Sequence, residues 1–487
     1  MRQQLARRST VVLDRVLRSA PWRLVPGRER RFALQVRTAR LLRWVQRRQE
    51  ARIDTTLAGR ALLAVEPDAV GRMAARLPEG VVAVSATNGK TTTVNLLAGV
   101  LEAAGRPPVV NRLGENQAPG VAVELAAAAR RGRRLAGSIG VFEVDELSLP
   151  ALVPQLRPRL VVLGNLFRDQ LDRAGELDTV AARWAAMLAD CEPDTAIVLC
   201  ADDPRVSSLA PDRTGVVRFG VRPPAGHHGR LAESADPPAC ARCGAELCYD
   251  AVLVGHLGHH RCPSCGAARP QPEVEATDVV LHGLAGSDLV LRTPDGSVAL
   301  RLAVPGLYNV YNAVAAGAAA WALGVPLDGV AQGMAATRPS FGRAEGLTVG
   351  RTPVRLLLTK NPTGMNEVLR LLTAEAAGRA LDVLFLLNDR DLDGRDVSWI
   401  WDADVEDVVP VLRHATCGGS RATSLAVRLK YAGVDPSHID VSPPVAEALE
   451  AAMASAPGEL FVVSNYSAML ELRELVAEQG HAPRFWR

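Results

Sequence analysis

From Val81 onward, short apolar runs alternate with stretches of helical character, and this alternation constrains the fold more than any other feature of the sequence. Strands that alternate with helices form a mostly parallel sheet with helices on both faces, and ligands bind at the carboxyl ends of its strands. Each run ends in polar residues. The runs are VVAVSA, SIGVFEVDE, RLVVLGN and AIVLCADD. We therefore predict an α/β fold with its chemistry at these strand ends.

A second α/β unit, Rossmann-like in pattern, is predicted to begin near Val354, with VRLLLT, VLFLLND and ELFVVSN as its strands. Before it, Pro294, Asp295 and Gly296 predict the turn of a β-hairpin, and the helix NVYNAVAAGAAAWALG follows. The segment from about 222 to 275 breaks the rhythm with Pro, Gly, His and Cys, so we interpret it as an insertion. The predicted domains are a basic helical segment 1–52, a central domain 53–345 that carries the insertion, and a C-terminal domain 346–487.

The composition favours a large globular protein. The chain has 487 residues, of which 48% are hydrophobic and 22% are charged, so it can bury the cores of two or three domains. Apolar runs long enough to span a membrane and the pattern of a secretory signal are both missing from the sequence. We therefore expect a cytoplasmic protein.

Positive charge is concentrated at the start of the chain. Residues 1–52 contain fifteen arginines but only Asp14, Glu29 and Glu50 as acidic residues, although the whole chain has a net charge of +3. We interpret this segment as a solvated basic helix packed on the body of the protein. A peripheral contact with anionic lipid headgroups at the inner face of the cell membrane stays open, as does a contact with nucleic acid.

The segment SATNGKTTT, from Ser85 to Thr93, has the context of a phosphate-binding loop, because it follows an apolar run and opens a helix. The full G-x-x-x-x-G-K-[ST] pattern would have Gly at Val84, so the match is partial. Backbone N–H groups at such a turn hold phosphate oxygens, the lysine reaches the terminal phosphates, and a following hydroxyl ligates Mg²⁺. The candidate nucleotide-binding residues here are Thr87, Asn88, Gly89, Lys90, Thr91 and Thr92.

In its short form T-N-G-K-T-T, this loop resembles that of the Mur ligase family, whose members use ATP to activate a carboxylate as an acyl phosphate for attack by an amine. Five further segments resemble family motifs in the same chain order. They are FEVDE, GNLFRDQLDRAGELD, CADDPRV, GLYNVYNAVAA and FGRAE. In the loop itself, the Thr91 or Thr92 hydroxyl can ligate Mg²⁺, and Thr91 is the candidate ligand. The resemblance implies that Glu143 also ligates Mg²⁺, that Asn309 approaches the nucleotide base, and that Arg343 lies near the phosphates.

Three departures from the family pattern concern the loop and the nucleophile. Ala86 stands where the loop commonly has a glycine, and Gln170 stands where the family has a metal-binding histidine, between the matching Asp169 and Asp172. The downstream helix TVAARWAAML has no lysine, a feature of members that add amino acids. The changes at Gln170 and in this helix indicate a nucleophile smaller than an amino acid.

Four cysteines in the insertion have the spacing of a metal site. Cys240 and Cys243 form one C-x-x-C pair and Cys262 and Cys265 another, each followed by Gly, which predicts a structural Cys₄ zinc ribbon. Disulfides are the alternative. Other nearby side chains that could substitute as ligands are Cys248, His256, His259 and His260. The remaining cysteines, interpreted as core or incidental residues, are Cys191, Cys200 and Cys417.

The C-terminal segments LTKNPTGMNEVL and LLNDRDLDGRDVSWIWD resemble the synthetase subunits, within the Mur ligase family, of the complex that amidates the D-glutamate of lipid II. This resemblance implies catalytic roles for Lys90 and Glu143 in phosphorylating the glutamate α-carboxylate. It also implies a GatD-type glutamine amidotransferase partner that supplies ammonia, with Asp396 completing the partner's Cys–His pair. Taken alone, the Asp-rich loop is compatible with a solvated turn, a metal site or a group that positions a partner's base.

Two alternatives remain at this point. One is a ligase of the same family that adds an amino acid, of the folylpolyglutamate or muramyl-peptide type. The other is a nucleotide-regulated module that uses the ribbon and the basic N-terminus to bind nucleic acid. The ribbon segment CARCGAELCYDAVLVGHLGHHRCPSCG has few basic residues, so we expect no nucleic acid partner.

Overall fold

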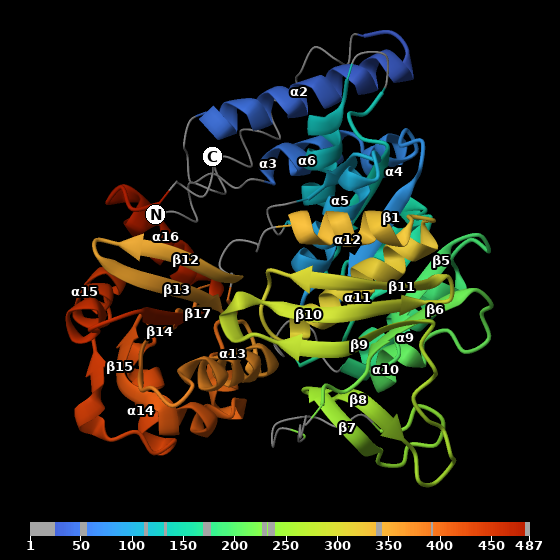
Figure 1. Cartoon of the computed structure of the whole chain (residues 1–487). Coiled ribbons are helices and arrows are strands. Elements are labelled where there is room, and N and C mark those ends of the chain that lie inside the picture. The colour runs from blue at the N-terminus through green and yellow to red at the C-terminus, as the bar shows by residue number, and fades with distance from the viewer. Residues whose placement is uncertain are drawn as a thin grey trace.

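The computed structural model describes residues 25–48, 56–111, 115–130, 134–168, 177–225, 231, 239–337, 343–390 and 393–482. Two sheets dominate these residues, a nine-stranded one and a six-stranded one (Figure 1). The predicted α/β class with mostly parallel sheets is confirmed. Each predicted apolar run forms a strand.

The nine-stranded sheet has the order β11-β10-β9-β6-β5-β4-β1-β3-β2. Along this order, every pair between β9 and β2 is parallel. The pairs β9–β10 and β10–β11 are antiparallel. The central strands are buried along their whole length, as expected for a sheet covered on both faces. The bounds are β1 Val81–Ser85, β2 Pro108–Val110, β3 Ile139–Glu143, β4 Leu160–Leu163, β5 Ala196–Cys200, β6 Val216–Val221, β9 Val274–Leu281, β10 Ser287–Thr293 and β11 Gly296–Leu302.

Helices cover this sheet. Helices α5, α11 and α12 pack against one another beside it, and α11 is so rich in alanine that it lies almost completely buried on strands β4 to β6, β9 and β10. The bounds are α2 Arg28–Arg48, α3 Leu57–Val65, α4 Ala69–Ala74, α5 Lys90–Ala103, α6 Ala118–Ala128, α7 Leu149–Leu156, α9 Leu177–Ala189, α10 Pro204–Ser207, α11 Leu307–Ala322 and α12 Leu327–Ala336, with the 3₁₀ turn η3 Gly283–Ala285.

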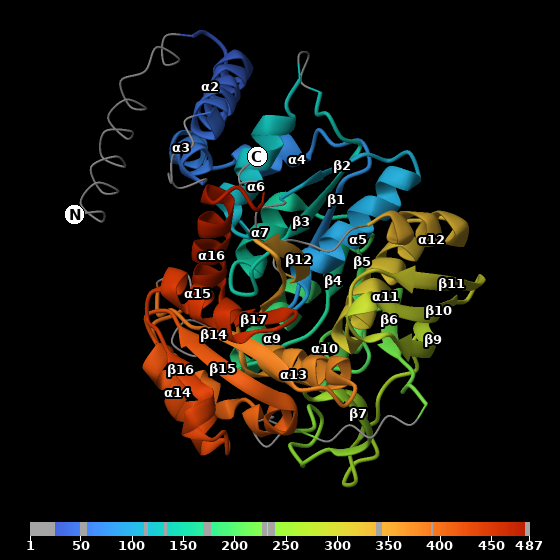
Figure 2. The same ribbon diagram turned by 60° about the vertical axis from the view of Figure 1, so that its left-hand side comes forward.

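The insertion leaves the sheet after β6 and returns at β9, because these two strands pair directly, with Phe219 opposite Val274. Between them, β7 Cys248–Val254 and β8 Leu257–Arg261 form an antiparallel hairpin at the lower end of the molecule (Figures 1 and 2).

The six-stranded sheet has the order β12-β13-β17-β14-β15-β16, and all its pairs except β12–β13 are parallel. The bounds are β12 Arg343–Val349, β13 Thr352–Leu358, α13 Pro362–Ala376, β14 Leu381–Leu386, η4 Ser398–Asp402, η5 Val405–Val411, β15 Leu412–Gly418, α14 Ala422–Tyr431, η6 Pro436–His438, β16 Ile439–Val441, α15 Val445–Ser455, β17 Leu460–Ser464 and α16 Tyr466–Glu478.

Helix α2 is the first described element. It packs on α3 and α6 through a buried side that includes Phe32, Val36 and Ala39. Among the described helices, none combines the length and the apolar character that crossing a bilayer requires.

Candidate active site

The loop between β1 and α5 has the conformation of a phosphate-binding turn. Gly89, at the N-cap of α5, has φ +90°, and a Cβ atom at this position would lie 1.9 Å from Oδ1 of Asn312. Only glycine fits this backbone and this approach. The backbone N–H groups of the first turn of α5 begin directly after it, so this helix N-terminus can receive an anion.

Lys90, the first residue of α5, is buried, with 5% of its surface exposed. Its Nζ atom donates to Glu146 Oε2 at 2.9 Å and to the Thr87 carbonyl at 3.2 Å, and it also contacts the Ala86 carbonyl. The ammonium group therefore lies over the loop in a desolvated setting, where a phosphate would interact with it more strongly than in water.

Thr91 and Glu143 meet at the ends of neighbouring elements. The Thr91 hydroxyl donates to Glu143 Oε2 at 2.7 Å. Glu143 ends β3, and its backbone N–H and carbonyl are both bonded by the side-chain amide of Asn111, at 2.8 and 2.7 Å. A hydroxyl and a carboxylate held this close offer the oxygen ligands that Mg²⁺ prefers.

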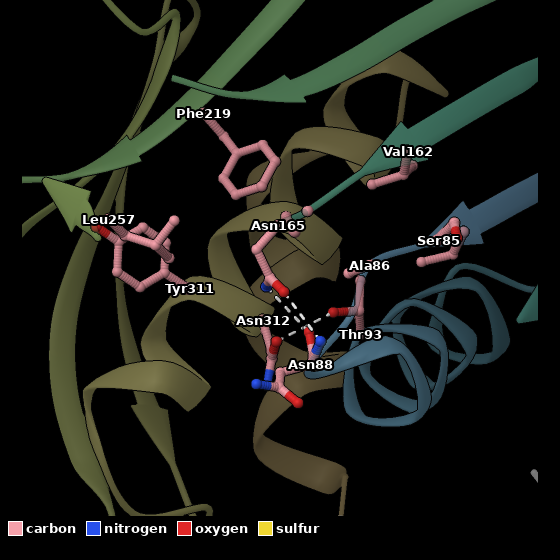
Figure 3. Close-up of a pocket in the computed structure, with 13 residues that line it drawn as sticks. Ser85, Ala86, Asn88, Thr93, Val162, Asn165, Phe219, Leu257, Tyr311 and Asn312 are labelled. Atoms are coloured by element: carbon pink, nitrogen blue, oxygen red, sulfur yellow. Dashed lines mark hydrogen bonds between the residues drawn. The ribbon is translucent and has the colours of Figure 1, made fainter. Parts of the chain in front are cut away.

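A layer of asparagines lies beside the loop (Figure 3). Asn165 accepts from the Asn88 backbone N–H at 2.9 Å and donates to the Asn88 carbonyl at 3.0 Å. Asn312 lines the pocket drawn in Figure 3, and its amide donates to Asn309 Oδ1 at 2.9 Å. Asn309 itself is buried and donates to the Pro305 carbonyl. The motif resemblance had drawn attention to Asn309, and it missed Asn312 as a pocket residue.

The other wall of this pocket includes Phe219, Tyr311 and Leu257 (Figure 3). Leu257 belongs to the inserted hairpin, which is bonded to the central sheet through the Gly258 N–H and the Asp202 carbonyl at 2.9 Å. Asp202 also accepts from the Tyr311 hydroxyl at 2.6 Å. The insertion therefore contributes directly to the pocket beside the phosphate loop, and no motif in the insertion predicts this contact.

The four predicted cysteines come together. The ligand atoms of Cys240, Cys243, Cys262 and Cys265 all lie within 4.8 Å of one another. Sγ of Cys240 is 3.6 Å from Sγ of Cys265, and Sγ of Cys243 is 3.5 Å from Sγ of Cys262. All four cysteines are free thiols in this structure, and these two separations are longer than the S–S bond of about 2.0 Å in a disulfide. The cluster suits four thiolates around one ion.

The neighbouring histidines have other partners. His256 bonds to Asp203 at 3.2 Å, His259 to the Val221 carbonyl at 3.1 Å, and His260 to the Gly258 carbonyl at 3.2 Å. These contacts favour the ligand set of four cysteines over one that includes a histidine.

The C-terminal domain reaches the phosphate loop through Asn361. Its Nδ2 donates to Asn88 Oδ1 at 3.0 Å, and the Asn88 Nδ2 donates back to Asn361 Oδ1 at 3.2 Å. Asn361 is also the N-cap of α13, where it accepts from the Gly364 N–H at 2.9 Å. This reciprocal amide pair joins the two domains at the site.

The Asp-rich loop after β14 contains two different carboxylates. Asp393 is buried and accepts from the Ser467 N–H at 2.9 Å and from the Ser467 hydroxyl, and burial raises the pKa of Asp393. Asp396 is exposed, and hydrogen bonds from the backbone and hydroxyl of Ser398 lower the pKa of Asp396. The carboxylate of Asp396 is therefore ionised at neutral pH and accessible.

Glu115, a carboxyl group of the central domain, has a raised pKa, in contrast to Asp396. Burial, together with the nearby Glu124, raises the pKa of Glu115 to about 7 against the opposing effect of Arg43. Burial raises the pKa of Tyr466 in the C-terminal domain, and the charges of Glu115, Glu143 and Asp393 add to this rise. An acidic region thus lies where the two domains face each other, and no sequence motif indicated it.

Several predicted residues lie partly or wholly outside the described residues. Asp169, Gln170 and Asp172 fall in the segment 169–176, and Asp391 falls in 391–392. Arg343 begins β12, opposite Leu357, and only its backbone is described. Thr92, by contrast, lies within the described residues and is buried in the first turn of α5.

Solved structures with the same fold define the class of the protein. The pseudomurein peptide ligase type C from Methanothermus fervidus superposes with a TM-score of 0.62 at 21% identity, covering 83% of this chain and 79% of that one. The MurF ligase from Thermotoga maritima in complex with ADP gives a TM-score of 0.59 at 13% identity, covering 86% and 85%. The chain therefore has the Mur ligase fold.

Sequence relatives define the family within this class. The Mur ligase middle domain matches residues 84–236 and the MurT ligase C-terminal domain matches residues 358–469. The MurT subunit of the glutamine-hydrolysing lipid II isoglutaminyl synthase from Streptococcus pneumoniae is 31% identical over 87% of this chain and 93% of that protein. The Staphylococcus aureus N315 subunit is 32% identical over 78% and 84%. The chain belongs to the MurT family, and it is an ATP-dependent ligase of peptidoglycan synthesis.

Proposed function

We propose that this chain is the synthetase subunit that amidates the α-carboxylate of D-glutamate in lipid II, with ATP as the activating substrate and ammonia as the nucleophile. The observation that carries the proposal is the similarity to MurT subunits along nearly their whole length. The arrangement of Lys90 and Thr91, at the start of α5, beside Glu143, at the end of β3, supports it.

The chemistry requires activation because a carboxylate is a poor electrophile. A carboxylate oxygen bonds to the γ-phosphorus of ATP while the bond to the ADP oxygen breaks. Ammonia then bonds to the carbonyl carbon, phosphate leaves, and the nitrogen loses a proton to become the amide. Lys90 would offset the charge that gathers on the phosphates, and Thr91 and Glu143 would hold the Mg²⁺ that neutralises it further.

Ammonia would come from a GatD-type glutamine amidotransferase subunit. The relatives are named as subunits of a glutamine-hydrolysing synthase, which supports a second subunit here. The exposed, ionised carboxylate of Asp396 suits the third position of a Cys–His–Asp arrangement, where it would orient the partner's imidazole and stabilise its protonated form. In this proposal, residues 53–345 activate the carboxylate and residues 346–487 contact the partner.

The cysteine cluster would hold a structural zinc ion. With Zn–S bonds of about 2.3 Å, tetrahedral geometry puts the sulfurs about 3.8 Å apart, close to the separations of 3.5 and 3.6 Å in this site. Metal analysis of the purified chain should find about one zinc per chain. The variant Cys243→Ser should lose it, while Cys248→Ser, a neighbouring exposed cysteine outside the cluster, should keep it.

The experiment that tests the function uses the purified chain, ATP and lipid II with ammonium chloride, followed by mass spectrometry of the lipid and assay of ADP. We expect ADP and a product in which one hydroxyl group is replaced by an amino group. Glutamine should replace ammonium only when the amidotransferase subunit is present. Product formation with an added amino acid, and not with ammonia, would overturn the proposal in favour of an amino-acid-adding ligase.

A further inference from the structure

Helix α2 packs on the body of the protein through one side, and its opposite side carries exposed charged residues. Phe32, Val36 and Ala39 are buried on the inner side. Arg43 is buried as well, where it donates to the Val123 carbonyl at 3.2 Å and pairs with Glu124 of α6. This anchoring sets which side of α2 faces outward.

The outer side is rich in arginine and also exposes two large apolar side chains. Leu41 is 58% exposed and Trp44 is 50% exposed. Their spacing from Arg30 and Arg37 follows the helical repeat, so these four residues form one stripe. The exposed described residues of the helix are Arg28, Arg30, Arg31, Arg37, Arg40, Leu41 and Trp44.

The acidic residue of α2 does not neutralise this face. Glu29 is the single acidic residue of the helix, and it pairs with Arg72 at 2.5 Å and with Arg76 at 3.7 Å. Arg72 lies in α4, and Arg76 lies two residues beyond its C-terminal end. Both guanidinium groups lie over the ring of Phe32, on the inner side of α2.

Of the exposed arginines, Arg28 lies 3.9 Å from Asp68, and Arg40 donates to the Ala129 carbonyl at 2.9 Å. The positive charge of the outer face therefore rests on Arg30, Arg31 and Arg37, within a segment 1–52 that has fifteen arginines against three acidic residues.

We propose that the outer face of α2 docks on the surface of an anionic lipid bilayer. Arginines near such a surface are attracted by the negative headgroups, and tryptophan and leucine side chains enter the boundary between headgroups and acyl chains. A nucleic acid would also attract the arginines, but it offers no apolar layer for Leu41. The combination of arginines with Leu41 and Trp44 favours the bilayer.

The position of α2 in the fold suits this docking. Helix α2 lies at one end of the molecule, opposite both the β7–β8 hairpin and α14 (Figures 1 and 2). It packs on α6, which begins just after Glu115, and the Glu115 carbonyl accepts from the same Asn111 amide that holds Glu143. A bilayer on α2 would thus be connected through α6 and Asn111 to the strand end that carries Glu143, which suits a lipid-linked substrate, a point that rests on the proposed function. The turn after Asp396, which contacts α14, stays free for a protein partner.

The test measures co-sedimentation of the full chain with vesicles of phosphatidylcholine that do or do not contain phosphatidylglycerol. We expect binding to the anionic vesicles, weakening as salt rises, and little binding to pure phosphatidylcholine. The triple variant Arg30→Gln, Arg31→Gln, Arg37→Gln should bind roughly 100-fold more weakly, at about fivefold per charge. The variant Leu41→Ser should bind anionic vesicles several-fold more weakly while keeping the salt dependence.

The matched control is Arg183→Gln, Arg351→Gln, Arg379→Gln, which removes the same charge from exposed positions elsewhere. It should bind like the original chain, and circular dichroism should show all variants folded. Equal binding of the two triple variants, or equal binding to neutral vesicles, would overturn the proposal. Arginine-dependent binding to duplex DNA or RNA that the Leu41→Ser variant leaves unchanged, without vesicle binding, would overturn it in favour of nucleic acid.

The vesicle assay contains no ATP and no lipid II, so it is independent of the amidation assay. Vesicle binding without amidation would leave the docking surface standing and remove the proposed function. Amidation without vesicle binding would do the reverse.

Discussion

The phosphate loop and the Asp396 loop each follow a strand of a different sheet, but the charged side chain is buried in the first and exposed in the second. Each follows a strand that is buried along its length, β1 in one sheet and β14 in the other. In the phosphate loop, Lys90 is 5% exposed and its ammonium already contacts oxygens of its own chain. In the other loop, Asp396 faces solvent.

The two loops suit different kinds of chemistry. A buried, preorganised charge stabilises a reacting phosphate without reorganisation, so the phosphate loop can act within one chain. The Asp396 carboxylate is exposed and ionised, so a side chain of another protein can reach it. Its hydrogen bond from the Ser398 N–H at 2.8 Å fixes its direction and stabilises the ionised form.

Lys90→Ala should impair the enzyme more than any of the following substitutions, because it removes the cation of the preorganised site. We expect amidation to fall by about 100- to 1,000-fold with ammonia and with glutamine alike. The measurement is ADP release under both conditions. Lys430→Ala, which removes an exposed lysine of α14, is the matched control and should keep full activity. Normal activity of the Lys90 variant would place the phosphates elsewhere.

The next effect separates the two loops. Asp396→Asn should reduce glutamine-dependent amidation by at least about 100-fold, because an amide cannot stabilise a protonated imidazole, and should leave ammonia-dependent amidation unchanged. The assay compares the two nitrogen sources in the two-subunit complex. Asp389→Asn, in the same loop, should retain both activities. Equal loss with both sources would assign Asp396 to the synthetase site and remove the contrast between the loops.

Local sequence signals predicted the parts of the molecule that depend on local geometry. The apolar runs that became β1 and β14 and the paired cysteines at 240 and 262 are such cases, because strand burial and a C-x-x-C turn are encoded in neighbouring residues. The Thr91–Glu143 contact followed from family motifs, which carry long-range information that periodicity lacks.

Contacts between distant segments could not be predicted in this way. Nothing near Leu257 indicates that the insertion folds back onto the pocket, and nothing near Asn361 indicates that it pairs with Asn88. Both depend on how separate units pack, and a single sequence does not encode that in any short pattern. The raised pKa of Glu115 has the same origin, because it requires burial between elements.

A smaller effect tests the link between the two domains. Asn361→Ala removes the amide pair with Asn88 and the N-cap of α13, so it should lower stability by about 1–2 kcal/mol. Asn361→Asp keeps an oxygen for the cap but loses the donor to Asn88 and adds a negative charge beside the phosphate loop. We expect it to retain most of the thermal stability and to bind ATP several-fold more weakly. If calorimetry showed that Asn361→Asp binds ATP as tightly as the original chain, Asn361 would act only as the N-cap of α13.

The smallest expected effect is a pH-dependent gain of stability in Glu115→Gln. The pKa of Glu115 rises from 4.5 to about 7 on folding, so the folded state prefers the protonated carboxyl, and the original chain loses stability as pH rises from about 4.5 through 7. The glutamine variant should therefore melt at the same temperature near pH 4.5 and a few degrees higher at pH 8. Glu478→Gln, at an exposed position on α16, should show no such trend. If Glu115→Gln also showed none, the carboxyl would be as well solvated as Asp396, and the acidic region between the domains would be open and not desolvated like the phosphate loop.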